Sequence, residues 1–397
     1  MHFATIGAGV AGLASAIALR QAGHSVSVYE RAPAIRSLGA GIVSWPNASW
    51  VLDMLGVWEA LRPHGTRVHA MQRYTSGGEW LGCIDVRVID AAMGHASMAI
   101  LRHDLMHALL ARALELGVVL HYGQRLRDVV ALEEAGAGAT QLIFENGATV
   151  QPDWVLGTEG RMRSRCRAFV LGSEDAARPV YQGFVNWIGI CETAEPVFEP
   201  GAVLDYWGTG ERFGVVALSP QRAYWAGGAA APLGQAEPAH YRTELTRRFA
   251  HWPAPVQQAL AGTPDGGIHQ IFLHDHDPTP QWQRANVLLL GDAAHAPLPT
   301  SGQGACQALE DAWHLAQCVQ AQGDDVPQAW QQFAALRQPK TAGITLAGRH
   351  LARGIFHTPA AGIAQRNRVA RETDYAAMAA GMAQGWSQGL PLSPVAA

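Results

Sequence analysis

Residues 2–12 read HFATIGAGVAG, an apolar strand pattern that runs directly into a glycine turn. A helical pattern follows from about Gly12 to Ala22, and a second strand pattern runs from Ser25 to Glu30. This order of strand, glycine turn, helix and strand predicts a βαβ unit. The chain is therefore expected to begin with a Rossmann-like α/β domain.

The glycines of this turn fit the three roles that dinucleotide binding requires. Gly7 permits a tight turn, Gly9 lets a pyrophosphate approach the backbone, and Gly12 lets helix and strand pack closely. The helix N-terminus offers N–H groups to phosphates. Glu30, at the end of the second strand, is placed to bind a ribose hydroxyl. The motif predicts a dinucleotide site and does not by itself choose between NAD and FAD; a purely structural glycine turn is the alternative.

Composition limits the classes of function. The 397 residues suggest two domains. A net charge of −4 without long runs of one sign argues against a nucleic-acid partner. The five scattered cysteines form no C-x-x-C pair and indicate reduced thiols in the cytoplasm. The N-terminal residues lack the pattern of a signal peptide, and no apolar window is long enough to predict a transmembrane segment.

The rest of the chain alternates between helical and strand-like sequence patterns. Helical spacing predicts a helix over 101–117, and short alternating runs over about 178–272 predict an antiparallel sheet. Eight of the 21 Trp and Tyr residues lie between Tyr181 and Trp252, which fits an aromatic-lined face, although core packing also explains them. A buried strand is expected from Asn286, followed by a long helix, and the last twenty or so residues are expected to be a helix fraying into a loose tail.

A second candidate cofactor-binding motif, after the glycine turn at residues 7–12, is GDAAHAPLPTSGQG, residues 291–304. Asp292 follows an apolar strand, where its carboxylate can accept hydrogen bonds from a polyol chain. Pro299 and the Gly302-Gln303-Gly304 turn lead into a helix whose N–H groups can stabilise negative charge on a flavin ring. This segment favours FAD; a strand ended by a simple helix cap is the alternative.

Together these segments resemble the class A flavoprotein monooxygenases, the para-hydroxybenzoate hydroxylase family. The resemblance rests on GAGVAGLASAIALRQAG (7–23) with VYER (28–31), on GDAAHAPLPTSGQGACQALEDA (291–312) and on GTEGRMRSRCR (157–167). GAGIVSWPNA (39–48) and LRHDL (101–105) also match, so the resemblance covers roughly residues 1–350. It implies that NAD(P)H reduces a tightly but non-covalently bound FAD, that O2 adds to form a flavin hydroperoxide, and that one oxygen passes to an aromatic ring.

The resemblance also assigns residues to the cofactor. It places Gly7, Gly9 and Gly12 at the pyrophosphate, Glu30 at the adenosine ribose, and Arg31 beside the adenine. Arg102 would reach the ribityl–phosphate region and Asp292 a ribityl hydroxyl. The remaining cofactor positions that it implies are Ala11, Val43, Leu126, Pro299, Gly302, Gln303, Gly304 and Ala305.

The turn at 157–160 departs from the family pattern, in which an Asp stands between the two glycines. Here Glu159, one methylene longer, takes that place, and the resemblance implies that it contacts FAD or NAD(P)H. The arginines that follow are expected to begin a helix, with Arg161 and Arg165 on one face and Arg163 and Arg167 on another.

On the substrate side, Arg212 and Tyr224 resemble an arginine and a tyrosine, twelve residues apart, of FAD-dependent urate hydroxylases. An arginine could hold an anionic substrate, and a tyrosine could polarise or deprotonate a ring N–H or O–H. Packing on a strand surface is the alternative for both.

Three other features favour structural roles. The His274–Asp277 run is expected to be a solvated turn rather than a metal site, and no metal is predicted. His295 is expected to be structural, and Cys306 is expected to be a small helix residue rather than a reactive thiolate.

The resulting prediction is an FAD-dependent aromatic hydroxylase that uses NADH or NADPH and O2 on a small aromatic or N-heteroaromatic substrate, as a monomer or homodimer. A reductase or other oxidoreductase on the same scaffold and a non-catalytic flavin-binding module are the alternatives. The FAD-binding domain is predicted over 1–70, 98–177 and 272–345, a substrate-binding sheet over 71–97 and 178–271, and a C-terminal helical segment and tail over 346–397.

Overall fold

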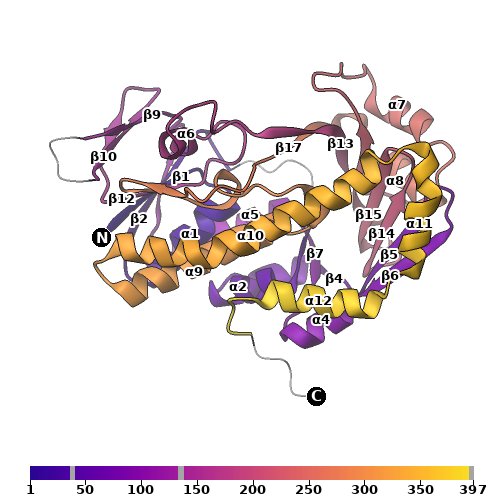
Figure 1. Ribbon diagram of the computed structural model, residues 1–397, viewed down its shortest axis with the longest axis horizontal. Coiled ribbons are helices and arrows are strands. Elements are labelled where there is room, and N and C mark those ends of the chain that lie inside the picture. The colour runs from indigo at the N-terminus through magenta and orange to yellow at the C-terminus, as the bar shows by residue number, and fades with distance from the viewer. Residues whose placement is uncertain (36–40, 133–137, 393–397) are drawn as a thin grey trace.

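The computed structural model describes residues 1–35, 41–132 and 138–392. Two large sheets stand at opposite ends of the molecule, and the long helix α10 (Val326–Phe356) reaches from one toward the other (Figure 1). The predicted α/β class, with a Rossmann-like half and a sheet of largely antiparallel strands, is confirmed.

The first sheet has six strands in the order β18-β19-β12-β1-β2-β8. Strand β1 pairs in parallel with β2 on one side and with β12 on the other, and β12 pairs in parallel with β19. The strands are β1 (His2–Ile6), β2 (Ser25–Glu30), β8 (Val119–Tyr122), β12 (Trp154–Gly157), β18 (Gln283–Arg284) and β19 (Val287–Leu289). The predicted opening unit is therefore present, with α1 (Val10–Gln21) as its crossover.

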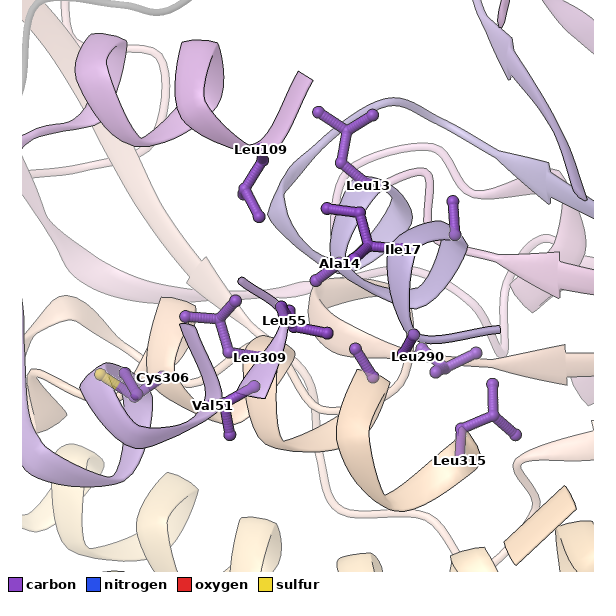
Figure 2. Packing of buried hydrophobic residues seen from close by; sticks show 14 of the residues in the cluster. Leu13, Ala14, Ile17, Val51, Leu55, Leu109, Leu290, Cys306, Leu309 and Leu315 are labelled. Atoms are coloured by element: carbon purple, nitrogen blue, oxygen red, sulfur yellow. The ribbon is translucent and has the colours of Figure 1, made fainter. Parts of the chain in front are cut away.

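Helix α1 is buried over nearly its whole length because it is enclosed by other elements. It packs against its own sheet, against α9 (Gly304–Gln322) and against α5 (Arg102–Glu115). Leu13 and Ile17 of α1, Leu109 of α5 and Leu309 of α9 converge in the largest core (Figure 2). Its Ala-rich sequence, ASAIA, allows this close approach from several sides.

The second sheet has seven strands in the order β17-β13-β16-β15-β14-β5-β6. All pairs within 178–275 are antiparallel, as predicted, while β14 pairs in parallel with β5. The strands are β5 (Ala70–Thr75), β6 (Trp80–Asp85), β13 (Val180–Glu192), β14 (Ala202–Trp207), β15 (Glu211–Ser219), β16 (Arg222–Ala230) and β17 (His269–Asp275).

The remaining elements of the described residues are two small sheets, eight further helices and several short 3-10 turns. Two three-stranded sheets are formed by β11 (Thr149–Val150), β10 (Thr140–Phe144) and β9 (Leu126–Ala131), and by β3 (Gly41–Ser44), β7 (Met98–Leu101) and β4 (Thr66–Arg67). The other helices are α2 (Pro46–Met54), α3 (Trp58–Leu61), α4 (Val86–Met93), α6 (Arg165–Leu171), α7 (Tyr241–Arg248), α8 (Ala254–Ala261), α11 (Ile363–Glu372) and α12 (Tyr375–Ser387). Short 3-10 turns occupy 62–64, 265–267, 291–293, 299–301 and 360–362.

Two observations concern the C-terminal third, of which the second corrects a prediction. Helix α10 runs unbroken across residue 345, where the FAD-binding part was expected to end; the division into interleaved domains remains a prediction. The helix expected near the C-terminus is present as α12, but the residues that follow it are anchored as far as Leu390, which is buried. Residues 393–397 of the expected loose tail lie outside the described ranges, as do residues 39 and 40 of the GAGIVSWPNA segment.

Candidate functional site

The three glycine turns singled out in the sequence lie side by side at one edge of the six-stranded sheet. In the parallel register Ile6 is opposite Gly157, and Gly157 is opposite Leu289. The turns that follow β1, β12 and β19 therefore leave the sheet at neighbouring carboxyl ends. This is the edge at which open α/β sheets bind dinucleotides.

The first turn has the shape that its glycines predict. Gly7 has φ +103°, and a Cβ added there would lie 2.8 Å from the carbonyl oxygen of Thr158. A Cβ on Gly12 would lie 1.9 Å from the carbonyl oxygen of Gly7, whereas a Cβ on Gly9 would meet no atom within 4 Å. Gly9 thus faces open space in front of α1, whose N-terminus has no side-chain cap among the described residues. This cradle fits a pyrophosphate.

Glu30 binds the backbone of the glycine turn and also that of the residues just after β2. Its two carboxylate oxygens accept hydrogen bonds from the backbone N–H groups of Ala8 (2.9 Å) and Ala32 (2.8 Å). The remaining lone pairs of a carboxylate can still accept ribose hydroxyls. Glu30 therefore couples the shape of the phosphate cradle to the proposed ribose position.

Glu159 caps a helix. Its carboxylate accepts hydrogen bonds from the backbone N–H groups of Arg165 and Cys166 (both 3.0 Å) and from the hydroxyl of Ser164 (2.7 Å). Helix α6 consequently begins at Arg165, with Ser164 as its N-cap. The expectation that the helix includes Arg161 and Arg163 is wrong, because the capping residues Glu159 and Ser164 set its start four residues later.

The four arginines of this segment therefore have separate roles. Arg161 pairs with Asp292 at 3.3 Å, and Arg165 pairs with Glu174. Arg167 is buried and donates to the carbonyl oxygens of Ala293 (2.8 Å) and Ala294 (3.0 Å), while Arg163 is exposed. Burial lowers the pKa of Arg167 to about 10, so it remains charged at neutral pH. Arg161 and Arg167 thus fix the segment that carries Asp292.

The turn at 299–304 is supported by Trp45. Gly302 has φ +65°, and its carbonyl oxygen accepts a hydrogen bond from Nε1 of Trp45 at 2.9 Å. Gln303 is buried, and its Oε1 accepts from the side-chain amide of Asn47 at 2.9 Å. Gly304 begins α9, whose N-terminus has no side-chain cap among the described residues, and Pro299 begins the 3-10 turn before it. We refer to residues 297–305 as the flavin loop.

A buried ionic network lies beneath this loop, and the sequence analysis missed it. Arg337 of α10 contacts Glu310 Oε2 and Asp311 Oδ1 of α9 at 2.5 and 2.8 Å. Asp311 Oδ2 also accepts hydrogen bonds from Nε2 of His295 (2.6 Å) and the backbone N–H of Gly291 (2.8 Å). Burial opposes ionisation of Asp311, but the neighbouring His295 and Arg337 outweigh it and hold its pKa below the usual value. The sequence feature that could have indicated this network is the pair of adjacent acids, Glu310 and Asp311, within an otherwise apolar helix.

The remaining predicted cofactor positions lie on several different elements. Arg31 directly follows β2 and Arg102 begins α5, and both are exposed. Val43 lies in β3, and its carbonyl oxygen is 3.7 Å from Sγ of Cys306 at the start of α9. Leu126 is buried at the start of β9, two residues beyond Gln124, whose N–H donates to the carbonyl oxygen of Glu30. Ala11 and Ala305 lie in the first turns of α1 and α9.

Arg212 and Tyr224 lie on one face of the seven-stranded sheet. Arg212 is opposite Gly228, and Tyr224 is opposite Val216, so the pair is offset by four residues on adjacent strands. Phe213 and Trp225, on the other face, join the core under α7 and α8. Val216 instead belongs to the largest core, which also contains residues of α1 and α9, and Tyr224 packs against it. Arg212 and Tyr224 therefore lie on the sheet face that Tyr224 presents to this core.

Each of the two residues has a defined environment. Nε of Arg212 donates to Oδ1 of the buried Asp205 at 2.6 Å, and Asp205 Oδ2 accepts from Nε1 of Trp207 at 2.8 Å. The Tyr224 ring lies so close to Gly41 of β3 that a Cβ there would overlap it. Burial raises the pKa of Tyr224 well above its usual value, so its hydroxyl stays protonated at neutral pH.

The structure differs from the sequence-based prediction for one of three features, the His274–Asp277 run. The His274–Asp277 run is not a solvated turn, because all but Asp277 are buried and Arg349 bridges Asp275 and Asp277. His295 binds Asp311, as described above, and has the structural contact expected of it. Burial raises the pKa of Cys306 to about 12, which keeps it a thiol. No cluster of three potential metal ligands occurs within 1–35, 41–132 and 138–392.

The fold and the cradle define a flavoprotein with one dinucleotide-binding domain. A family described as FAD binding domain matches residues 2–326. The chain belongs to this family, and its relatives place it among the class A flavoprotein monooxygenases. FAD is accordingly its cofactor.

Relatives extend along most of the chain. It is 34% identical over 339 residues to an aurachin C monooxygenase/isomerase of Stigmatella aurantiaca, covering 83% of each chain. It is 31% identical over 351 residues to an FAD-dependent urate hydroxylase of Klebsiella pneumoniae, covering 88% of this chain and 89% of that one. The Klebsiella pneumoniae HpxO structure with FAD and uric acid superposes with a TM-score of 0.88 at 27% identity, covering 98% and 97% of the two chains.

Within the described part of the chain, no helix is both long enough and apolar enough to cross a bilayer.

Proposed function

We propose that this protein is an NAD(P)H- and O2-dependent FAD monooxygenase that hydroxylates a small aromatic or N-heteroaromatic substrate. FAD would supply the redox chemistry by way of a flavin hydroperoxide, with one oxygen atom passing to the ring and the other leaving as water. The observation that supports the proposal is that Arg212 and Tyr224 share one sheet face, on which Tyr224 packs against the core that contains α1 and α9.

The sheet surface between Arg212 and Tyr224, formed by Gly214 and Ala226 and called the floor of the site below, suits a flat ring. Gly214 and Ala226 are opposite each other, midway between the Arg212–Gly228 and Val216–Tyr224 pairs. A Cβ on Gly214 would meet only two backbone oxygens, at 3.8 and 3.9 Å. Four residues of strand span about 13 Å, which leaves room for one or two fused rings once the side chains at both ends are counted.

Each end of this floor has a chemical role in the proposal. Asp205 holds Nε of Arg212 and so orients the guanidinium, whose other N–H groups would bind an anionic or carbonyl oxygen of the substrate. Tyr224 stays protonated and would donate to a ring oxygen or nitrogen, polarising the ring rather than removing a proton from it. The enclosing sheet would exclude water from the reacting atoms.

The urate and 6-hydroxynicotinate hydroxylases among the relatives support a heteroaromatic substrate. The test is anaerobic stopped-flow reduction with NADH and NADPH, followed by mixing with O2, across a panel of phenols, hydroxypyridines and purines. We expect one compound class to accelerate flavin reduction and to yield a product one oxygen atom heavier. Reduction that no member accelerates, with no hydroxylated product, would contradict the proposal and favour a reductase or a binding module.

A further inference from the structure

The C-terminal helix α12 contacts the flavin loop through a pair of tryptophans. Trp386, near the end of α12, is buried and packs against Trp45 with ring centroids 5.1 Å apart. Trp45 in turn donates its Nε1–H to the carbonyl oxygen of Gly302 at 2.9 Å. Trp386, which lies 84 positions beyond Gly302 in the sequence, therefore supports Trp45, the residue that positions Gly302.

A second series of contacts, which includes an ion pair, links the end of α12 to the flavin loop. Nζ of Lys340 donates to the carbonyl oxygens of Trp386 (2.7 Å) and Gln388 (2.9 Å), which lie at the end of α12. The same ammonium group lies 2.8 Å from Oε2 of Glu310. Glu310 Oε1 accepts from Nδ2 of Asn47 (2.7 Å), and that nitrogen also donates to Gln303 Oε1 (2.9 Å).

Both routes end on adjacent residues of the flavin loop. The first reaches the backbone of Gly302, and the second reaches the side chain of Gln303. Every intermediate group is buried, so each contact has fixed partners rather than water. Figure 1 shows α12 running beside α4, against which it packs. Trp45, the ring that Trp386 contacts, is the N-cap of α2, the helix that carries Asn47.

We infer that α12 is a brace for the flavin loop, and that Trp386 is a positioning residue that acts on FAD through Trp45 and Gly302. Because Lys340 holds the end of α12, the position of Trp386 is set by the same ionic network that underlies the loop. The inference rests on FAD as cofactor and is independent of which substrate is hydroxylated.

The test uses the full chain with Trp386→Ala and Trp386→Phe. Apoprotein is titrated with FAD, the Kd is measured from flavin fluorescence, and the visible absorption spectrum of the bound flavin is recorded. We expect Trp386→Ala to raise the Kd about three- to tenfold, the size expected for one aromatic pair, and to change the bound-flavin spectrum. Trp386→Phe, which keeps a ring against Trp45, is expected to restore most of both.

Trp80→Ala is the matched control, because Trp80 is half exposed on β6 and is not part of either route. Equal effects of Trp386→Ala and Trp80→Ala on the Kd would overturn the inference, as would an unchanged Kd and spectrum in Trp386→Ala.

A second variant decides the matter if Trp386→Ala does not fold. Trp45→Phe keeps an aromatic ring against Trp386 and removes the N–H that binds Gly302, so we expect a weaker FAD complex and an altered spectrum, with the unfolding midpoint of the apoprotein nearly unchanged. Where Trp386→Ala does fold, its effect on the Kd and that of Trp45→Phe should be non-additive in a double-mutant cycle. Additive effects, or no effect of Trp45→Phe, would show that α12 does not act through Gly302.

Discussion

At the residue scale, the glycines of the first turn have separable tasks. A Cβ on Gly12 would collide with the backbone of Gly7, so Gly12→Ala should destabilise the apoprotein by about 3 kcal/mol or more. A Cβ on Gly9 meets no protein atom, so Gly9→Ala should leave the apoprotein stability unchanged while weakening FAD binding at least about tenfold. Denaturant unfolding and FAD titration distinguish the two; similar stability losses would refute this division.

Glu159 supplies a second residue-scale prediction. Its carboxylate reaches the N–H groups of Arg165 and Cys166, which the side chain of an aspartate, one methylene shorter, would not reach equally well. Glu159→Asp should therefore cost about 1 kcal/mol of stability, as loss of a helix cap does, with FAD retention and NAD(P)H affinity nearly unchanged. A marked loss of either affinity would instead indicate that Glu159 contacts a cofactor directly.

At the element scale, the pairing of β15 with β16 creates the floor of the proposed substrate site. Gly214→Val would place a branched side chain on that floor, so we expect the Kd of the substrate to rise at least about tenfold while FAD affinity stays unchanged. Val215→Ala, on the opposite face, is the control for general weakening of β15. If Gly214→Val binds the substrate normally, the ring lies elsewhere.

Helices α9 and α10 are joined by the buried charges around Arg337. Replacing Arg337 with methionine would leave Glu310 and Asp311 buried with less compensation, so we expect a loss of about 3–5 kcal/mol in the free energy of unfolding. Chemical denaturation at neutral pH measures this loss. A change below about 1 kcal/mol would show that water or Lys340 replaces the guanidinium.

At the scale of the whole molecule, buried neutral histidines make stability depend on pH. Burial, with nearby arginine charges, lowers the pKa of His276 to about 3 and that of His314 to about 4. The unfolded chain, with histidine pKa values near 6.5, binds more protons as the pH falls below that value. The contribution of these two histidines to stability is therefore complete above about pH 6.5 and is lost as the pH falls toward their folded-state pKa values.

Each histidine should contribute about 2 kcal/mol to the loss between pH 7 and pH 5. Unfolding free energies of the wild type and His314→Gln over this range test the prediction, because the loss of stability between pH 7 and pH 5 should be smaller by about 2 kcal/mol in the variant. A wild-type stability that is flat between pH 7 and pH 5 would contradict it.

The sequence by itself determined the parts of the site that depend on neighbours along the chain. Gly7, Gly9 and Gly12 need only local backbone geometry, and Glu30 follows at the end of the next strand, so the dinucleotide cradle was predictable from spacing. The two substrate candidates came from a resemblance. Their common face follows from strand register, which a sequence pattern indicates only in part.

Only the tertiary structure decided which distant groups meet. Trp45 and Gly302 are 257 positions apart, and Lys340 reaches the carbonyl oxygen of Trp386 across 46 positions. The start of α6 was predicted wrongly because two capping side chains outweighed the helical spacing of the arginines. Long-range contacts form because burial takes polar groups away from water and so requires another partner for them, and because aromatic rings leave water by packing together. The fold, rather than the adjacent sequence, supplies the partner in each case.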